Sequence, residues 1–319
     1  MGKRRITTGE YIGYILEAII VIPLSLLIAL LPFWMGYALA DALAFLFFHL
    51  DKKNKKWAYE NLNIIFAENP LPKKEADALV KKVYKNLARG GFEYFKLWQI
   101  TEKNASRYGY FENYHIIEEC LAQGKGVIVV TCHLGNWEYF GSISVKQKKS
   151  NLAVIINRQF NPFTDAWLKF IREKWGKVRC FYNEVSDMKG IVRHLRENGV
   201  IAILADQTYY FKPIFVPFFG KQSATADGPA KLHLRYGAPI VMGFSIRESD
   251  GRYRFVFEKP YIHPSTGNME KDAAEIMTYI NSRYEEYIRK YPEQWFSLLH
   301  PRWEKTRPED FVDIDWDPF

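Results

Sequence analysis

The longest apolar run of the chain lies near its amino terminus, where residues 18–40 carry no charged side chain. A helix of about 20 apolar residues spans the hydrocarbon core of a bilayer. Pro23 and Pro32 interrupt the run, and proline kinks or splits a helix. We therefore predict a hydrophobic membrane anchor within residues 1–50, formed by a single span or a re-entrant hairpin. A cleaved signal peptide and a buried core helix are the alternatives.

After this anchor, short β-branched runs alternate with segments of helical periodicity. The predicted strands cover residues 126–131, 152–157, 178–182, 200–205, 239–246 and 253–257. The predicted helices cover residues 73–100 with a break at Gly90-Gly91, 134–145, 163–175, 187–198, 227–236 and 275–291.

This alternation predicts an α/β fold in which helices flank a mainly parallel mixed sheet. Gly251, between the last two strands, indicates one antiparallel hairpin at an edge of that sheet. The only clear composition boundary lies near residue 50. Residues 51–319 are accordingly expected to form a single catalytic domain behind the anchor.

The charge balance narrows the possible partners. The chain of 319 residues has a net charge of +8, which attracts anionic lipid, nucleic acid or an acidic protein. Zinc-finger spacing, a basic zipper and an RNA-recognition signature are missing from the sequence, so we expect no nucleic acid partner. The three cysteines lack CxxC spacing, which argues against a disulfide framework or a metal site.

Two polar clusters follow predicted strands. Thr131-Cys-His-Leu-Gly-Asn-Trp-Glu138 comes after the first strand, and Asp206-Gln207 comes after the strand that ends at Ala205. Ligands of open α/β sheets collect at the carboxyl ends of the strands. These two clusters are therefore the candidate site.

His133 and Glu138 are candidates for a general base and its orienting carboxylate. On one ideal helix they would lie about 140° apart, but a histidine in a strand-to-helix turn can meet an acid in the first helical turns. A carboxylate on one imidazole nitrogen raises the basicity of the other. The alternative is a structural histidine at a strand end. Cys132 is badly placed as a nucleophile for His133, because neighbours on an extended segment point to opposite faces.

Other residues are candidates for substrate binding. Arg158 and Arg172 could contact a phosphate or an oxyanion, or lie on a solvated helix face. Asp206 and Gln207 could orient a donor or hold a backbone turn. The sequence contains no Gly-x-Ser-x-Gly elbow and no phosphate-binding P-loop, which excludes the usual serine hydrolases and P-loop nucleotidases.

Several ordered motifs together resemble one known family, the bacterial lipid A biosynthesis lauroyl/myristoyl (late) acyltransferases. The resemblance runs from the apolar amino terminus to at least Phe244. The matching stretches are Trp57-Ala-Tyr-Glu-Asn-Leu62, Thr131–Glu138, Asn157-Arg158 with Asn161-Pro162, Asp206-Gln207, Val216-Pro-Phe-Phe-Gly220, Ala224-Thr225, Gly228-Pro-Ala230 and Gly237-Ala-Pro239.

The resemblance implies an enzyme on the cytoplasmic side of the inner membrane. It would transfer a fatty acyl chain from acyl carrier protein, or from acyl-CoA, to a hydroxyl of a lipid A precursor. By motif position His133 would be the base and Glu138 its partner, with Arg172 and Asp206 at further site positions. No cofactor, metal or covalent acyl-enzyme is expected.

Three other functions stay open at this point. The family has relatives that acylate other glycolipids, including phosphatidylinositol mannosides. A glycerolipid acyltransferase could use the same two residues on a smaller phosphate acceptor. A membrane-tethered basic scaffold that binds an anionic membrane surface is the non-enzymatic alternative.

Overall fold

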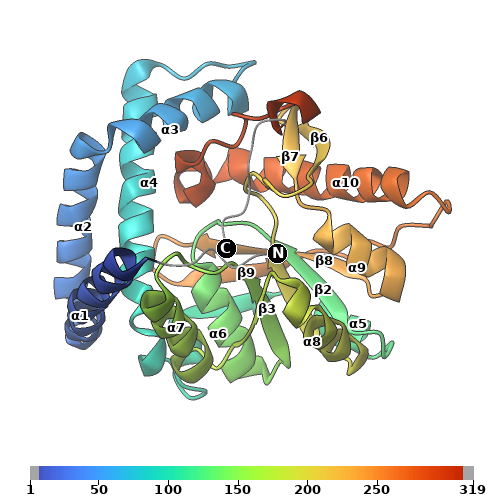
Figure 1. Ribbon diagram of the computed structural model, residues 1–319, viewed down its shortest axis with the longest axis horizontal. Coiled ribbons are helices and arrows are strands. Elements are labelled where there is room, and N and C mark those ends of the chain that lie inside the picture. The colour runs from blue at the N-terminus through green and yellow to red at the C-terminus, as the bar shows by residue number, and fades with distance from the viewer. Residues whose placement is uncertain (1–6, 312–319) are drawn as a thin grey trace.

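The computed structural model describes residues 7–311. Within them a seven-stranded sheet, ordered β1-β9-β8-β2-β5-β3-β4, lies between layers of helices (Figure 1). Its neighbouring strands are parallel except for the antiparallel pair β8–β9. The predicted α/β fold with a mainly parallel mixed sheet is thus confirmed. The strands are β1 (Gly109–Glu112), β2 (Val127–Thr131), β3 (Leu152–Ile156), β4 (Arg179–Tyr182), β5 (Val200–Leu204), β8 (Ile240–Arg247) and β9 (Tyr253–Phe257).

Most helices that surround this sheet follow the predicted alternation, whereas residues 52–65 and 115–121 form two helices that were not predicted. The helices are α1 (Thr8–Leu30), α2 (Phe33–Leu50), α3 (Lys52–Ile65), α4 (Lys73–Tyr94), α5 (His115–Leu121), α6 (Trp137–Lys148), α7 (Pro162–Phe170), α8 (Val185–Arg196), α9 (Gly228–Tyr236) and α10 (Met269–Lys290). A π-helical turn, Ile171–Trp175, extends α7.

Strand β2 explains why the sequence there reads as a continuous apolar run. Ile128 and Val130 point into the hydrophobic cluster on one face of the sheet, and Val127 and Val129 point into the cluster on the other. All five residues of β2 are buried. A strand covered by helices on both faces carries apolar side chains at every position.

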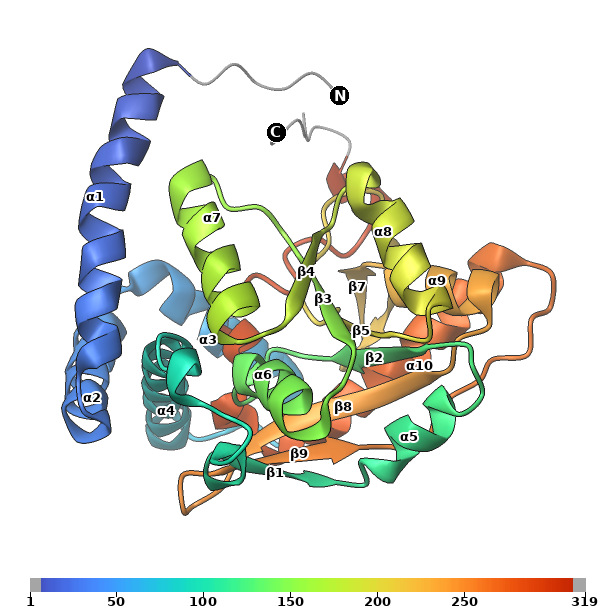
Figure 2. The same ribbon diagram turned by 90° about the horizontal axis from the view of Figure 1, so that it is seen from below.

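The predicted anchor consists of two helices. Pro32 separates α1 from α2, whereas Pro23 lies inside α1. Both helices are long and apolar enough to cross a membrane, and most of each surface is exposed. Figure 2 shows that they form an L, with α1 running up one side of the protein and α2 seen nearly end on at its foot. They therefore do not pair as a tight antiparallel hairpin.

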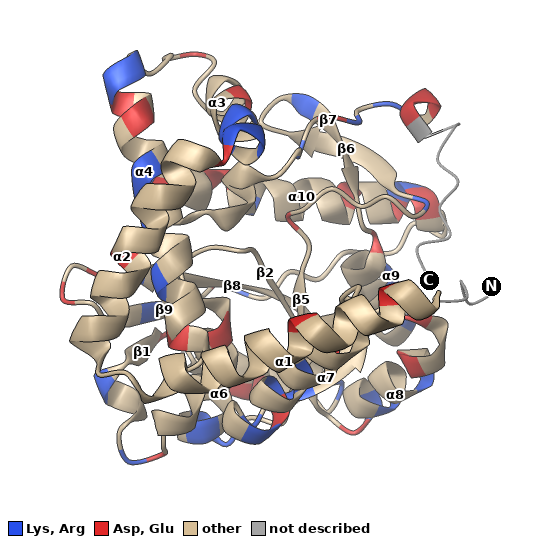
Figure 3. Cartoon of the chain, turned by 60° about the vertical axis from the view of Figure 1, so that its left-hand side comes forward, with Lys and Arg blue, Asp and Glu red and all other residues tan. Residues whose placement is uncertain are grey.

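Helix α2 is fixed to the globular part through small residues. Gly36, Ala40 and Ala44 are buried on the face of α2 that packs along α4. A Cβ atom at position 36 would lie 2.0 Å from the ring of Phe92 on α4, so any larger residue would displace that ring. In Figure 3 the surfaces of α1 and α2 carry few charges, whereas basic residues gather on α3 and at the start of α4.

Two predictions about individual elements were wrong. Helix α4 does not break at Gly90-Gly91 but continues to Tyr94. Its packing against α2 and α3 outweighs the weak helix propensity of glycine. The hairpin β8–β9 is not at the edge, because the unpredicted strand β1 pairs in parallel with β9. A separate hairpin, β6 (Ile214–Phe218) with β7 (Lys221–Thr225), was also missed.

Candidate active site

The turn between β2 and α6 has a tightly fixed backbone. Gly135 has a φ of +60°, and a Cβ atom there would lie 2.2 Å from the carbonyl oxygen of Ser245 on β8. Only glycine fits both conditions. Asn136 is the N-cap of α6, and its side chain accepts a hydrogen bond of 2.8 Å from the amide of Tyr139. The turn therefore presents His133 and Glu138 from a rigid base.

The imidazole of His133 is bound by Asp206. Nδ1 of His133 lies 2.7 Å from Oδ1 of Asp206. The two meet because β2 and β5 are neighbours, with Thr131 opposite Leu204. Since an ionised carboxylate only accepts hydrogen bonds, the proton is assigned to Nδ1 and Nε2 is left as the acceptor. Among the residues that the structure describes, none forms a hydrogen bond with Nε2.

Asp206 is fully buried and satisfied by three donors. Besides His133, the indole N–H of Trp295 (2.8 Å) and the hydroxyl of Ser297 (2.7 Å) donate to its other oxygen. Burial by itself raises the pKa of this carboxyl, but the imidazole and the two other donors outweigh burial and hold its pKa well below the usual value. Asp206 is therefore ionised at neutral pH and keeps the imidazole in one tautomer.

Trp295 and Ser297 belong to a segment that the sequence did not identify as part of the site. The amide of Phe296 donates to the carbonyl of His133 at 2.8 Å, which docks residues 292–299 against the turn. The ring of Phe296 stacks on Trp137, and both rings contact the imidazole. These residues follow a helix far along the chain and match no motif. The aromatic character of Trp295 and Phe296 alone gave no indication that this segment contacts Asp206 and His133.

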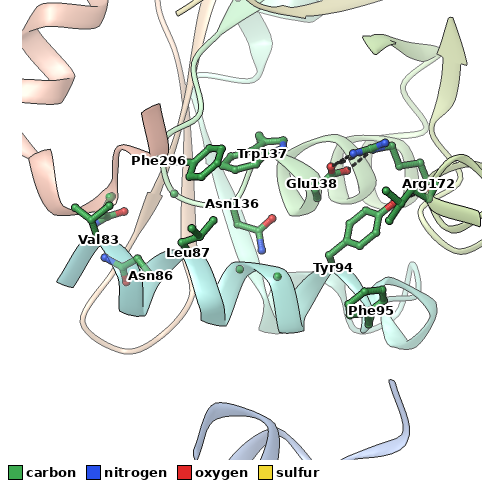
Figure 4. A pocket seen from close by; sticks show the side chains of 15 residues that line it. Val83, Asn86, Leu87, Tyr94, Phe95, Asn136, Trp137, Glu138, Arg172 and Phe296 are labelled. Carbon is green, nitrogen blue, oxygen red and sulfur yellow. Dashed lines mark hydrogen bonds and ion pairs between the residues drawn. The ribbon is translucent and has the colours of Figure 1, made fainter. Parts of the chain in front are cut away.

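Glu138 does not contact the imidazole as predicted; it binds Arg172 instead. The guanidinium forms three hydrogen bonds to the carboxylate, of 2.7, 3.0 and 3.1 Å (Figure 4). Arg172 comes from the π-helical turn after α7, and its guanidinium also lies 5.3 Å from the ring of Tyr94. Because both charges of this pair are satisfied by each other, Glu138 is not the residue that orients His133. That place belongs to Asp206.

Gln207 and Arg158 lie in different surroundings. Gln207 lines the same cavity as His133. Arg158 is absent from the residues that line this cavity, and its guanidinium forms an ion pair with Glu184 and lies 3.8 Å from the ring of Tyr182. The structure thus brings His133, Asp206 and Gln207 together, places Glu138 and Arg172 beside them, and puts Arg158 on a more exposed surface.

A cavity of about 770 Å³ opens at His133. His133, Gln207 and Asn157 line its polar part, at the carboxyl ends of the strands. Its apolar part extends between α6 and the sheet and is lined by Val129, Phe140, Leu152, Val154, Val178, Val200 and Ala202. Mostly apolar clefts with a few polar groups are typical of ligand sites.

A second cavity of about 220 Å³ lies on the other side of the Glu138–Arg172 pair. It is lined mainly by α4, together with Trp137 and Phe296 (Figure 4). Glu138 and Arg172 line both cavities, so this ion pair forms part of the wall between them.

The chemistry of the site fits proton transfer by an imidazole. Within residues 7–311 there is no group of three His, Cys, Asp or Glu side chains that could hold a metal ion. Cys132 is buried, and burial raises the pKa of its thiol well above the usual value. The thiolate that a cysteine nucleophile needs is therefore disfavoured. What the site offers is a histidine that lines a cavity and is bound through Nδ1 by a buried aspartate.

Comparison with known proteins decides the family. The sequence model of the bacterial lipid A biosynthesis acyltransferases matches residues 6–305. The chain belongs to this family. As a family member it is an acyltransferase, and the suspected resemblance is confirmed. The match covers the apolar amino terminus, the turn that carries His133 and the segment that carries Trp295 and Ser297.

Curated members of the lipid A acyltransferase family are similar to this chain over most of its length. The lipid A biosynthesis lauroyltransferase of Escherichia coli (strain K12) is 27% identical over 288 residues, which is 89% of each protein. A lipid A biosynthesis acyltransferase of Haemophilus influenzae (strain ATCC 51907 / DSM 11121 / KW20 / Rd) is 24% identical over 90% of this chain and 88% of that protein. A phosphatidylinositol mannoside acyltransferase of Mycobacterium tuberculosis (strain CDC 1551 / Oshkosh) is 26% identical, over 59% of this chain and 57% of its own length.

Proposed function

We propose that this family member transfers a fatty acyl chain from the thioester of acyl carrier protein, or of CoA, to a hydroxyl of a glycolipid, with a lipid A precursor as the preferred acceptor. The observation that carries the proposal is the position of His133, which lines a cavity with a large apolar part while Asp206 binds its Nδ1. The two lipid A enzymes align with 89% and 90% of this chain, whereas the mannoside enzyme aligns with 59%, and this difference favours a lipid A acceptor.

The proposed reaction needs only one proton carrier. Nε2 of His133 takes the proton of the acceptor hydroxyl while the oxygen attacks the thioester carbonyl carbon. The C–S bond then breaks, and the leaving thiolate takes the proton back from the imidazolium. Asp206, fixed by Trp295 and Ser297, stabilises the positive charge on the imidazole between these two steps.

The apolar part of the cavity is the proposed site of the acyl chain. It starts at the strand ends beside His133 and continues past Val129, Val154 and Ala202 beneath α6. Each methylene buried there contributes about 0.8 kcal/mol of binding free energy. The chain length that the cavity accepts therefore follows from its depth, which its apolar lining residues set.

Glu138 and Arg172 act in this proposal as a positioning pair. Their ion pair fixes the first turn of α6 to the turn after α7, and it separates the two cavities. Gln207 is placed in the polar part of the cavity, where its amide can contact the acceptor. Arg158 is proposed to contact substrate only at the outer surface, because its charge is already paired with Glu184.

We also propose that the enzyme is an inner-membrane protein with its site on the cytoplasmic side. The exposed apolar surfaces of α1 and α2 support attachment to the bilayer. Exposed lysines on α3, which follows α2 directly, suit an anionic membrane surface or the acidic acyl carrier protein (Figure 3).

The test offers one labelled acyl donor to several acceptors side by side. Purified full-length protein is mixed with acyl carrier protein thioester and with a lipid A precursor, a phosphatidylinositol mannoside, glycerol 3-phosphate or lysophosphatidate. Products are weighed by mass spectrometry, and the expected result is a mass increment of one acyl chain on the lipid A precursor. Transfer to the mannoside alone, or to a glycerol phosphate alone, would reassign the acceptor. Absence of any product would overturn the proposal.

A further inference from the structure

A second buried carboxylate, Glu93 on α4, lies behind the catalytic turn and takes no part in the proposed chemistry. Its side chain is 1% exposed. It accepts four hydrogen bonds: from Tyr37 (2.6 Å), Arg247 (2.6 Å), Asn136 (2.7 Å) and Tyr253 (2.7 Å). An ionised carboxylate has about four acceptor sites, so this group is fully satisfied.

The four partners come from different parts of the molecule. Tyr37 belongs to the apolar helix α2, and Asn136 caps α6 in the catalytic turn. Arg247 ends β8, and Tyr253 begins β9. Glu93 is therefore the point where an exposed apolar helix, the catalytic turn and the central sheet are joined. Figure 4 shows the amide of Asn136 directed towards α4.

Arg247 completes a closed circuit of hydrogen bonds around the turn, which we call the ring and which consists of Glu93, Asn136, Gly135, Gln294 and Arg247. Its side chain binds Glu93, and its backbone exchanges two hydrogen bonds with the side chain of Gln294, at 2.7 and 3.0 Å. The carbonyl of Gln294 in turn accepts from the amide of Gly135 at 3.0 Å. The turn is thus bound on one side through Asn136 and on the other through Gly135, and both connections lead to Glu93.

The charges of Arg247 and Tyr253 follow from their burial and from their contact with Glu93. Burial by itself lowers the pKa of Arg247, but the carboxylate of Glu93 outweighs it and the net pKa is raised above the usual value. Burial and Glu93 both raise the pKa of Tyr253, so its hydroxyl remains a donor. A carboxylate held by one cation and three neutral donors in a dry site fixes geometry strongly, because every group would lose its partner if one moved.

We infer that Glu93 is a positioning residue that holds the His133–Asn136 turn in its reactive geometry and couples that turn to α2. The inference rests on the proposed function only for its effect on catalysis; the effect on the order of the turn is independent of it. Because Tyr37 reaches Glu93 from an apolar helix, loss of the Tyr37 hydrogen bond changes the same carboxylate that fixes Asn136. The link between α2 and the turn therefore runs through the Tyr37–Glu93 hydrogen bond and not through the other contacts between α2 and α4.

The molecule provides a matched control for this link. Asp41 on α2 binds Arg89 on α4 through two hydrogen bonds of 2.7 Å. This pair also ties α2 to α4, and the guanidinium of Arg89 lies 4.9 Å from the ring of Tyr37, but the ion pairs that the structure describes for Asp41 do not reach the catalytic turn. Asp41→Asn therefore removes one α2–α4 contact and leaves the hydrogen bonds of Glu93 in place, whereas Glu93→Gln and Tyr37→Phe remove hydrogen bonds of Glu93 itself.

The experiment measures hydrogen exchange of the amides of residues 133–140 in the full-length protein, together with kcat and KM for acyl transfer. In Glu93→Gln we expect exchange of these amides to rise about tenfold or more, because the turn opens locally. We expect kcat to fall about ten- to a hundredfold with KM within about twofold, as for a small misplacement of catalytic groups. Tyr37→Phe should show the same pattern to a smaller extent, and it serves if Glu93→Gln does not fold. Asp41→Asn should leave both the exchange of the turn and kcat unchanged.

Unchanged exchange of residues 133–140 in Glu93→Gln or, where that variant does not fold, in Tyr37→Phe would overturn the inference. An equal change in Asp41→Asn would also overturn it, since the effect would then belong to the α2–α4 packing in general. Failure of the proposed function has a different signature: His133→Ala would keep wild-type transfer, while the exchange results on Glu93 would stand as measured.

Discussion

Asp206 and Glu138 are two carboxylates that flank the same turn, and they differ in what balances their charge. Asp206 comes from the neighbouring strand, is fully buried and binds the imidazole together with two neutral donors. Glu138 comes from the first turn of α6, is partly exposed and is neutralised by the guanidinium of Arg172. The carboxylate that is nearer to His133 in sequence is thus the one that does not bind it.

In the proposed mechanism, this difference decides which of the two carboxylates assists the base. A carboxylate that is already paired with a permanent cation has little remaining potential to stabilise a second positive charge. Within the described protein the hydrogen bonds of Asp206 come from His133 and two neutral donors, and the buried guanidinium of Arg302 interacts with its charge without a hydrogen bond, so the carboxylate keeps a direct contact with the charge that forms on the imidazole. His133 and Asp206 meet because their parallel strands are neighbours in the sheet, not because the two residues are close in the chain. The following predictions test this comparison, starting with the largest effect.

His133→Ala should remove the base and lower kcat for acyl transfer by about a hundred- to ten-thousandfold, the usual contribution of general base catalysis. Folding should be retained, because the imidazole makes only one hydrogen bond within the described protein. Steady-state kinetics with thermal unfolding checks both points. His115→Ala, which removes an exposed imidazole at the start of α5, is the control and should behave as wild type. Equal activity of the two variants would remove His133 from the mechanism.

Asp206→Asn should lower kcat by about a hundredfold, because a neutral amide cannot stabilise the imidazolium and favours the wrong tautomer. Trp295 and Ser297 both donate to one oxygen of Asp206, so the amide oxygen of asparagine must face them. The amide nitrogen then faces Nδ1 and forces the proton onto Nε2. The check is kcat together with nitrogen NMR of the imidazole. A variant that keeps both the rate and the tautomer would refute the role of Asp206.

Glu138→Gln and Arg172→Gln should each lower kcat by about tenfold and reduce the free energy of unfolding by about 2 kcal/mol, because each leaves one charge without its partner. The double variant should recover part of the lost stability. Thermal and urea unfolding of the three proteins measures the coupling. If Glu138→Gln instead lost as much activity as Asp206→Asn while Arg172→Gln stayed active, Glu138 would act on the base directly and the comparison would fail.

Arg158→Ala should have the smallest effect, with kcat and KM within about twofold and a stability change below about 1 kcal/mol, as for other exposed ion pairs. Its side chain is 42% exposed, and its guanidinium is paired with Glu184. Kinetics with the preferred acceptor gives the test. A large rise in KM would show that the acceptor displaces Glu184 and binds Arg158.

The elements of the fold were largely predictable because β2, β3 and β5 are buried on both faces and carry β-branched runs. Burial on two faces leaves a clear signal in a single sequence. Strand β1 and the hairpin β6–β7 were missed, since their residues neither form an unbroken β-branched run nor alternate regularly between apolar and polar. The break expected at Gly90-Gly91 did not occur, because the packing of α4 is a tertiary effect that local propensity does not contain.

The sequence predicted where the candidate site lies but not which carboxylate binds His133. The carboxyl ends of the predicted strands correctly brought His133 near Asp206, since neighbours in a parallel sheet end at one edge. The choice between Asp206 and Glu138 depended on strand order and on Arg172, which no local spacing contains. Trp295 and Ser297 reach Asp206 from a segment about ninety positions away in the chain. Such contacts follow from the path of the whole chain.

The close approach of Gly135 to the carbonyl of Ser245 limits how this enzyme can diversify. Any L-side chain at position 135 would force β8 and the turn apart, whichever lipid the protein acylates. A randomised library at this position should therefore return glycine under selection for either folding or turnover. New acceptor preferences have to arise from residues that border the cavity, while the backbone that carries the imidazole stays unchanged.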